Sequence, residues 1–362
     1  MFGKPRFIEH DRRIKFAIGG DARNEDCSFN QPQGLAFEPR RGHLFVADRI
    51  NGRVQVFSSD DGSFVAKLCR ARSPADVAID YDHDRVIVTE AASSEVQLRS
   101  LDDLRYLSHV GKRGSGEPEF HVPTGVAVDR HHHRIIIVDT NNHRLVFLSS
   151  IDLSFLFSIG SKRGSQPGEF SNPIGIAIDD DRHRIIVSDS FNYRVQVLSS
   201  IDGSFLFEFG SQGDQPGQLN LQRGVCVDNQ GRIIVADTLN SRLQAFTDEG
   251  HHISSFDCGL REPPYAVAFD EHRGLIAFTA GNRVHVIGAN QWLAGTFTWR
   301  PDRHRHAPSW MKRAVSTMTM IRSLVDECSA MSMIPNELLF EIFSMLDDDI
   351  QQPVARAKCT LM

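Results

Sequence analysis

A short apolar segment recurs six times along the 362-residue chain and limits the folds open to it. Each copy alternates apolar residues and ends on an acidic one. The copies read PQGLAFE (32–38), PADVAID (74–80), PTGVAVD (123–129), PIGIAID (173–179), QRGVCVD (222–228) and PYAVAFD (264–270). Their starts lie 42, 49, 50, 49 and 42 residues apart. A period of this length is typical of an architecture in which each repeated unit packs on the next.

Three further apolar runs follow the recurring segment in the full-length units. Examples are RIIIVD (134–139) for the second run, RVQVLS (194–199) for the third and SFLFSIG (154–160) for the fourth. Short β-branched and aromatic runs between Gly, Asn and Asp predict an antiparallel meander rather than helices. A single four-stranded sheet cannot bury its faces, whereas radial repetition of such sheets does. We therefore predict an all-β, six-bladed β-propeller.

A small residue occupies the middle of each first strand, where we expect crowding beside the propeller axis. This column is Ala36, Ala78, Ala127, Ala177, Cys226 and Ala268. Cys226 is accordingly predicted to be a packing residue and not a nucleophile.

The last unit has three strands only, so another segment must complete it. Residues 13–20, RIKFAIGG, align with the fourth strand SFLFSIG, and we predict that they close the sixth blade and remove a free sheet edge. The alternative is WLAGTFTW at 292–299. Either way, the propeller domain is predicted to span residues 1–299.

The turns between second and third strands share the pattern D-x-x-N-x-R. It reads DRINGR (48–53), DTNNHR (139–144), DSFNYR (189–194) and DTLNSR (237–242). Together with Gly-rich linkers such as GSKRGSQPGEFSNP (160–173), these turns resemble NHL repeats over roughly residues 14–287. Blade two departs, with Glu90 and Glu95 in place of Asp and Arg, and blade six has Ala280 in place of Asp.

The resemblance implies a recognition module. NHL propellers are known mostly as partner-binding ends of ubiquitin ligases, some bind RNA, and a related few are lyases, so the fold does not choose among these activities.

The Asp and Arg of the shared turn form pairs that recur in every good blade, as expected of a structural brace rather than of one asymmetric catalytic site. The pairs are Asp48 and Arg53, Asp139 and Arg144, Asp189 and Arg194, and Asp237 and Arg242.

The charge distribution disfavours nucleic acid as the partner. The net charge is −6, and the six blade-to-blade linkers carry a summed formal charge of −1. A protein that neutralises several phosphates should show a positive surplus. Four basic residues, Lys112, Arg113, Lys162 and Arg163, are candidates for a local patch on the docking face, with acidic neighbours beside them. RNA binding remains the alternative function.

Catalytic and metal signatures are not found in the sequence. Most of the sixteen histidines lie in turns, and none lies within the aligned first strands, so we expect no metal site, no cofactor and no small-molecule substrate. A metal-dependent lyase is the third alternative. The six cysteines are widely spaced, which favours free thiols in the cytoplasm or nucleus. No stretch is long and apolar enough to cross a bilayer, and the first residues do not resemble a signal peptide.

The C-terminal part has a different composition. Residues 300–331 are predicted to be a basic linker followed by a short helix, and 332–362 to be a partial helical segment. Within it, MIPNELLFEIFSMLDDDI (333–350) resembles the opening of an F-box. The matching residues are Ile334, Pro335, Leu338, Leu339, Ile342, Phe343 and Leu346. The resemblance implies docking on a Skp-type adaptor of a cullin ubiquitin ligase, with the propeller holding the substrate.

Two observations keep other interpretations of this segment open. The same stripe suits an ordinary amphipathic helix, and an F-box has three helices whereas twelve residues (351–362) follow here. The prediction as a whole is a non-catalytic interaction protein whose propeller binds a protein partner in ubiquitin ligation and proteasomal degradation.

Overall fold

The computed structural model describes residues 14–20, 25–69, 71–258 and 262–293. The chain divides into two compact units, Met1–Phe297 and Thr298–Met362. The predicted linker (300–331) and the F-box-like stripe from Ile334 to Leu346 fall in the second unit and lie outside the described residues.

The described residues form six four-stranded antiparallel sheets, which are the blades. Blade one is β2 (Pro32–Glu38), β3 (His43–Asp48), β4 (Arg53–Ser58) and β5 (Phe64–Cys69). Blade two is β6 (Pro74–Asp80), β7 (Arg85–Glu90), β8 (Glu95–Ser100) and β9 (Tyr106–Val110). Blade three is β10 (Pro123–Asp129), β11 (Arg134–Asp139), β12 (Arg144–Ser149) and β13 (Phe155–Ile159).

The remaining blades repeat the same order. Blade four is β14 (Pro173–Asp179), β15 (Arg184–Asp189), β16 (Arg194–Ser199) and β17 (Phe205–Phe209). Blade five is β18 (Val225–Val227), β19 (Ile233–Asp237), β20 (Arg242–Phe246) and β21 (His252–Asp257). Blade six is β22 (Pro264–Asp270), β23 (Leu275–Ala280), β24 (Arg283–Gly288) and β1 (Ile14–Gly19), and a short helix α1 (Ala289–Leu293) follows β24.

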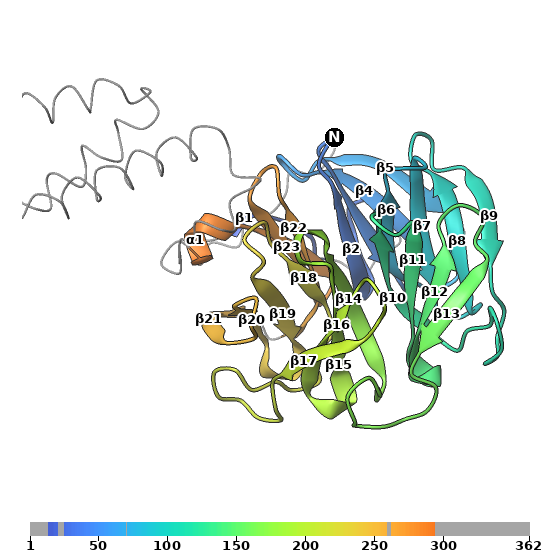
Figure 1. Cartoon of the computed structure of the whole chain (residues 1–362). Coiled ribbons are helices and arrows are strands. Elements are labelled where there is room, and N and C mark those ends of the chain that lie inside the picture. Colours follow the sequence, from blue (N-terminus) through green and yellow to red (C-terminus); the bar gives the residue numbers. More distant parts are fainter. Residues whose placement is uncertain (1–13, 21–24, 70, 259–261, 294–362) are drawn as a thin grey trace, which may run out of the picture. The chain divides into compact units, whose positions relative to one another are not determined.

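The first strands of the blades line the axis, and each contacts the first strand of the next blade, from β2 through β6, β10, β14 and β18 to β22 and back to β2. This closed ring is a six-bladed β-propeller, as the sequence predicts (Figure 1). No helix of the described residues is long and apolar enough to span a membrane.

The N-terminal strand completes blade six. β1 pairs antiparallel with β24, with Phe16 opposite Val286 and Ile18 opposite Val284. The ring is thus joined by strands from the two ends of the propeller sequence. In the alternative segment 292–299, Trp292 and Leu293 belong to α1 and the rest lies outside the described residues.

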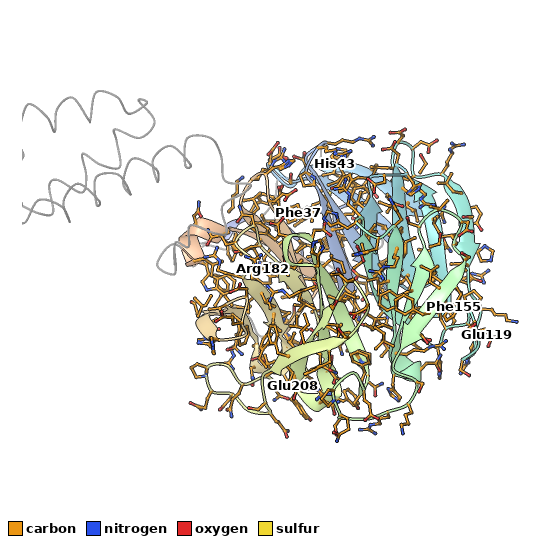
Figure 2. The ribbon with its side chains drawn as sticks, viewed as in Figure 1. Phe37, His43, Glu119, Phe155, Arg182 and Glu208 are labelled. Carbon is orange, nitrogen blue, oxygen red and sulfur yellow. The ribbon has the colours of Figure 1, made fainter. Side chains whose placement is uncertain are left out.

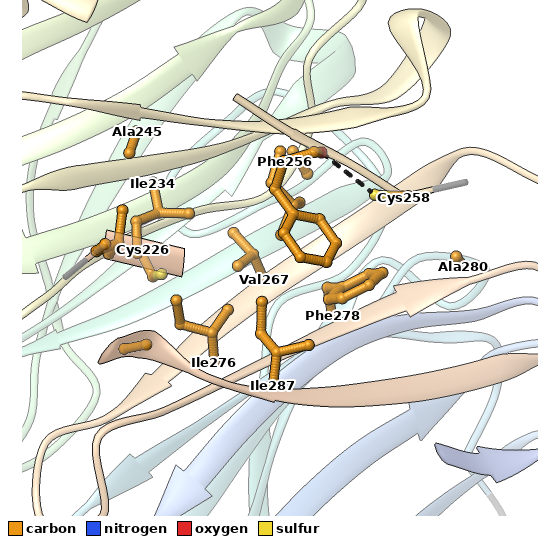
Figure 3. Close-up of a cluster of buried hydrophobic side chains, with 14 residues drawn as sticks. Cys226, Ile234, Ala245, Phe256, Cys258, Val267, Ile276, Phe278, Ala280 and Ile287 are labelled. Carbon is orange, nitrogen blue, oxygen red and sulfur yellow. Dashed lines mark hydrogen bonds between the residues drawn. The ribbon is translucent and has the colours of Figure 1, made fainter. Parts of the chain in front are cut away.

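The hydrophobic core lies between neighbouring blades. Figure 3 shows the cluster between blades five and six, where Phe256 and Phe278 pack edge to face with ring centroids 6.0 Å apart. Cys226 lies in the same cluster, and Ala268 packs between blades six and one. The small residues in the middle of the first strands are therefore required by packing against the adjacent blade, and not by crowding at the axis alone.

Glycines let the first strands approach each other closely. A Cβ on Gly175 would lie 2.2 Å from the carbonyl oxygen of Arg223, and one on Gly224 would lie 2.7 Å from the Cα of Ala266. Both distances are too short for non-bonded atoms, so glycine is required. In blade two the equivalent residue is Asp76.

Candidate functional site

The Asp–Arg pairs of the shared turn fasten the linkers to the blades. Arg194 Nε lies 2.9 Å from Asp189 Oδ2, and Arg194 also donates to the carbonyls of Gln166 and Glu169 in the linker that leads into its own blade. The Nε–Oδ2 distances in the equivalent pairs are 2.7 Å for Arg53 and Asp48, 2.9 Å for Arg144 and Asp139, and 2.8 Å for Arg242 and Asp237. These contacts hold linker and turn together on one face, which we call the linker face.

Three of these turns present an apolar side chain to solvent. Ile50, Phe191 and Leu239 occupy the third position of the motif and are 56%, 46% and 56% exposed. The backbone N–H of each donates to a carbonyl of the adjoining linker, so the turn is anchored while its side chain points outward. Blade three has Asn141 at this position. The linker face therefore carries fixed, exposed apolar groups.

A second set of Asp–Arg pairs lies at the opposite ends of the first strands, on what we call the hairpin face. Arg184 pairs with Asp179 at 3.0 Å and donates to the carbonyl of Asp248 in the next blade at 2.6 Å. Arg85 and Arg134 make the same kind of link, to Ser150 and Ser200 of the following blades. Sequence reasoning missed these links between blades. Their signal is the acidic residue that ends each first strand and the Arg that opens the second.

The four basic linker residues are exposed, and two of them have polar partners within the protein. Lys112 Nζ lies 3.2 Å from Glu119 Oε1, and Glu119 is at the periphery of the ring in Figure 2. Arg163 Nε donates to Ser171 Oγ at 3.0 Å. Arg113 is equivalent to Arg163, and Lys162 is equivalent to Lys112; both are exposed. Within the described residues no contact joins one linker's basic pair to the other's. These contacts give little support to a phosphate-binding patch.

A cavity of about 270 Å³ lies on the axis between the first strands. Its lining is mainly backbone, glycine and aliphatic side chains, with Arg223, Tyr265 and Asp76 among the few polar groups. Arg223 lies two residues before β18 and Tyr265 is the second residue of β22, so both are next to the linker face, and Asp76 is the third residue of β6.

Arg223 is a half-buried cation without a counter-ion. Its guanidinium carbon lies 4.8 Å from the centre of the Tyr265 ring. Among the described residues, no carboxylate or hydrogen-bond acceptor pairs with this guanidinium. Burial, together with the nearby Arg49, lowers the pKa of Arg223. Arg49 itself donates to Ser73 Oγ at 3.0 Å. The mouth of the cavity thus concentrates positive charge.

Asp76 is the carboxylate among the residues that line the cavity. It belongs to blade two, opposite blade five and Arg223 in the six-membered ring. Its oxygens accept hydrogen bonds from the backbone N–H groups of Val77, at 2.9 Å, and Val126, at 3.1 Å. Burial raises the pKa of Asp76 to about 7.

Blade two also differs at its turn. Glu90 and Glu95 face each other across β7 and β8, where other blades pair Asp with Arg. Glu90 Oε2 accepts from the backbone N–H of Arg72, while its buried Oε1 has no hydrogen-bond partner among the described residues. Burial raises the pKa of Glu90 to about 7. The linker before this blade, 69–73, is short, so there is little loop for an arginine to hold.

Blade six contains a buried histidine. His285 occupies the position of Gln55, Gln196 and Gln244 in other blades, whose amides bond to linker carbonyls. The His285 ring instead stacks on Phe278, and within the described part of the chain neither ring nitrogen has a hydrogen-bond partner. Burial lowers the pKa of His285 to about 4.

Metal chemistry has no ligand set in the described ranges: no group of three or more His, Cys, Asp or Glu side chains there could hold an ion. Cys226 is buried in the core, and burial raises the pKa of its thiol. A buried, protonated thiol is a poor nucleophile.

The repeats match a known family model. The NHL repeat model matches residues 29–57, 170–198 and 223–246, in blades one, four and five. The chain is thus a six-bladed β-propeller with NHL repeats. No curated protein matches its sequence.

Similar solved structures share the fold. A gluconolactonase from Xanthomonas campestris has a TM-score of 0.59 at 17% identity, over 76% of this chain and 98% of that one. A protein from Bacteroides thetaiotaomicron has a TM-score of 0.56 at 17% identity, over 73% of this chain and 70% of that one. The catalytically inactive virginiamycin B lyase of Staphylococcus aureus, solved with quinupristin, has a TM-score of 0.53 at 12% identity, over 72% of this chain and 98% of that one.

Proposed function

We propose that the chain is a non-catalytic recognition protein whose linker face binds a protein partner. The observation that carries the proposal is the trio Ile50, Phe191 and Leu239. Large apolar side chains on anchored turns lose little conformational entropy on binding, and their burial in an interface is favourable.

The charge at the centre of this face indicates the partner's chemistry. Arg223 has no anionic partner in the described part of the chain, and Arg49 lies near it. An acidic side chain placed over the axis would be attracted by both cations. The fitting partner therefore combines apolar side chains with an acidic group.

The test compares the two faces. Proteins captured from an extract by the wild-type propeller are identified and quantified, then compared for I50S/F191S/L239S and for I151S/I201S. Ile151 and Ile201 are 70% and 64% exposed but lie in turns of the hairpin face, so they control for loss of apolar surface. The proposal expects a partner that the first variant loses and the second keeps. Equal retention by both variants would contradict it.

We further infer a link to ubiquitin ligation, which rests on the resemblance of residues 333–350 to an F-box. If the stripe docks on a Skp-type adaptor, burial of each side chain in that interface contributes about 1.5–3 kcal/mol, so L339A/F343A should abolish adaptor capture. The melting temperature should stay unchanged. A lowered melting temperature with no adaptor bound by the wild type would refute this link.

The activities of the solved relatives are not carried over. Their identities of 12–17% support the fold alone, and the described residues offer no metal-ligand set. RNA binding, the alternative from the sequence, is weakened by the Lys112–Glu119 pair. A sub-micromolar RNA affinity at physiological salt would restore it.

A further inference from the structure

We propose that the axial cavity is a binding site for a small organic carboxylate, seated on Arg223. This site shares Arg223 with the proposed protein-binding face, but its test uses small carboxylates and can therefore fail separately from the proposed function. Gly125, Gly175 and Gly224 line the cavity without adding side chains to it, and a Cβ on any of them would clash with the neighbouring first strand. Its volume of about 270 Å³ is just below the roughly 300–1,000 Å³ usual for ligand pockets, which suits a metabolite-sized molecule.

Arg223 gives the cavity its preference for an anion. A guanidinium withdrawn from water without a counter-ion is unfavourable, and an entering anion removes that penalty. Tyr265 covers one face of the guanidinium at 4.8 Å, so the in-plane N–H groups are what remains for a ligand. Two parallel N–H donors match the two oxygens of a carboxylate.

The neighbouring groups reinforce this preference. Arg49 adds a second positive charge near Arg223. The Tyr265 hydroxyl has no partner among the described residues and is available as a donor. Asp76, the carboxylate in the lining, lies three blades away, and each of its oxygens accepts one backbone N–H, from Val77 and from Val126. It therefore leaves Arg223 open to a ligand.

Binding at this site can be distinguished from a general attraction of anions to the basic surface. Lys112 is paired with Glu119 at 3.2 Å, and Arg163 is held by Ser171 on an exposed linker. These residues carry the same charge as Arg223 but line no cavity in the described structure. Binding that depends on the cavity should distinguish Arg223 from Arg163.

The test is calorimetric titration of the full chain with acetate, benzoate and succinate, and with inorganic phosphate, at constant ionic strength in chloride. We expect saturable binding of at least one carboxylate to the wild type. R223Q should raise its dissociation constant at least tenfold, because a charge-assisted, two-point contact is lost. R223K keeps the positive charge but lacks the two parallel N–H donors, so its dissociation constant should lie between those of the wild type and R223Q. R163Q, the matched control on the same face, should change the constant less than twofold.

The variants are expected to fold, because the Arg223 guanidinium donates no hydrogen bond within the described structure and the backbone N–H of residue 223, which donates to Ala236, is unchanged by substitution. Without ligand, R223Q should melt no lower than the wild type. A peptide with a free C-terminus, compared with its amidated form, tells whether the carboxylate can come from a protein chain. Three results would overturn the proposal: no saturable binding of any carboxylate to the wild type, binding of phosphate alone, or equal weakening by R223Q and R163Q.

Discussion

His285 makes the propeller's stability depend on pH in a way that one substitution should remove. The ring is fully buried against Phe278, and burial, with a smaller contribution from Arg283, lowers its pKa from 6.5 to about 4. Between these two values the unfolded chain binds a proton that the folded chain does not. The free energy of unfolding is therefore highest above the unfolded pKa, and it decreases as the pH falls from about 6.5 towards 4. Each pKa unit corresponds to about 1.36 kcal/mol, so the loss reaches about 2 kcal/mol by pH 5.

Urea unfolding of wild type and H285L at pH 7.5 and pH 5.0 measures this contribution. Leucine removes both unpaired nitrogens and the titration, so we expect H285L to be no less stable than the wild type at pH 7.5. Its free energy of unfolding should fall by about 2 kcal/mol less on going to pH 5.0. H251L, at an exposed histidine, is the control and should follow the wild type. An H285L profile parallel to that of the wild type would refute the reasoning.

Three other perturbations follow from the same contacts. R194A removes the counter-ion of the buried Asp189 carboxylate and should cost about 3–5 kcal/mol in urea unfolding. R105A, which breaks an exposed pair, should change stability by less than about 0.5 kcal/mol, and equal effects would contradict the bracing role. The raised pKa of Asp76, about 7, means that the folded chain binds a proton more tightly than the unfolded one. The free energy of unfolding of the wild type should therefore fall by about 2–3 kcal/mol relative to that of D76N between pH 5 and pH 8. A constant difference between the two proteins would show that the carboxyl ionises normally. Deletion of residues 1–20 removes β1 and exposes β24, so the ring should unfold or aggregate; cooperative melting at the wild-type temperature would show that this strand does not seal blade six.

The blades were predictable from the sequence because their contacts are local. The predicted first-strand segment 32–38 coincides with β2, and 123–129 coincides with β10. Each sheet is a meander of hairpins, so alternation and turn residues within about fifty positions specify it. The six-bladed architecture follows from repeating that local pattern.

The axial site was not predictable in the same way, because its residues come from different blades. Arg223 and Tyr265 come from neighbouring blades, and Asp76 comes from a blade on the opposite side of the ring, packed against Gly34 of blade one. The clearest signal was a departure from the repeat: Asp76 stands where the other copies of the segment have Gly or Ala. The position of Arg223 and Tyr265 varies among the copies and gives no such signal. Alignment reveals such departures, but their convergence and the cavity between them require the closed fold.

The isolation of His285 also depends on tertiary structure. The sequence shows a histidine where other blades have glutamine, but only the structure shows that its ring packs on Phe278 without a polar partner in the described residues. The departure from glutamine in the repeat therefore marked position 285 in the sequence. The isolation of the ring follows from its burial, which only the structure shows.

The most direct measurement of the central claim is photo-crosslinking of the captured partner to each face. A photo-reactive residue replaces Leu239 on the linker face in one protein and Ile201 on the hairpin face in another, since both positions are exposed. The account predicts that the partner is labelled from position 239 and not from position 201. Labelling from position 201 alone would contradict it.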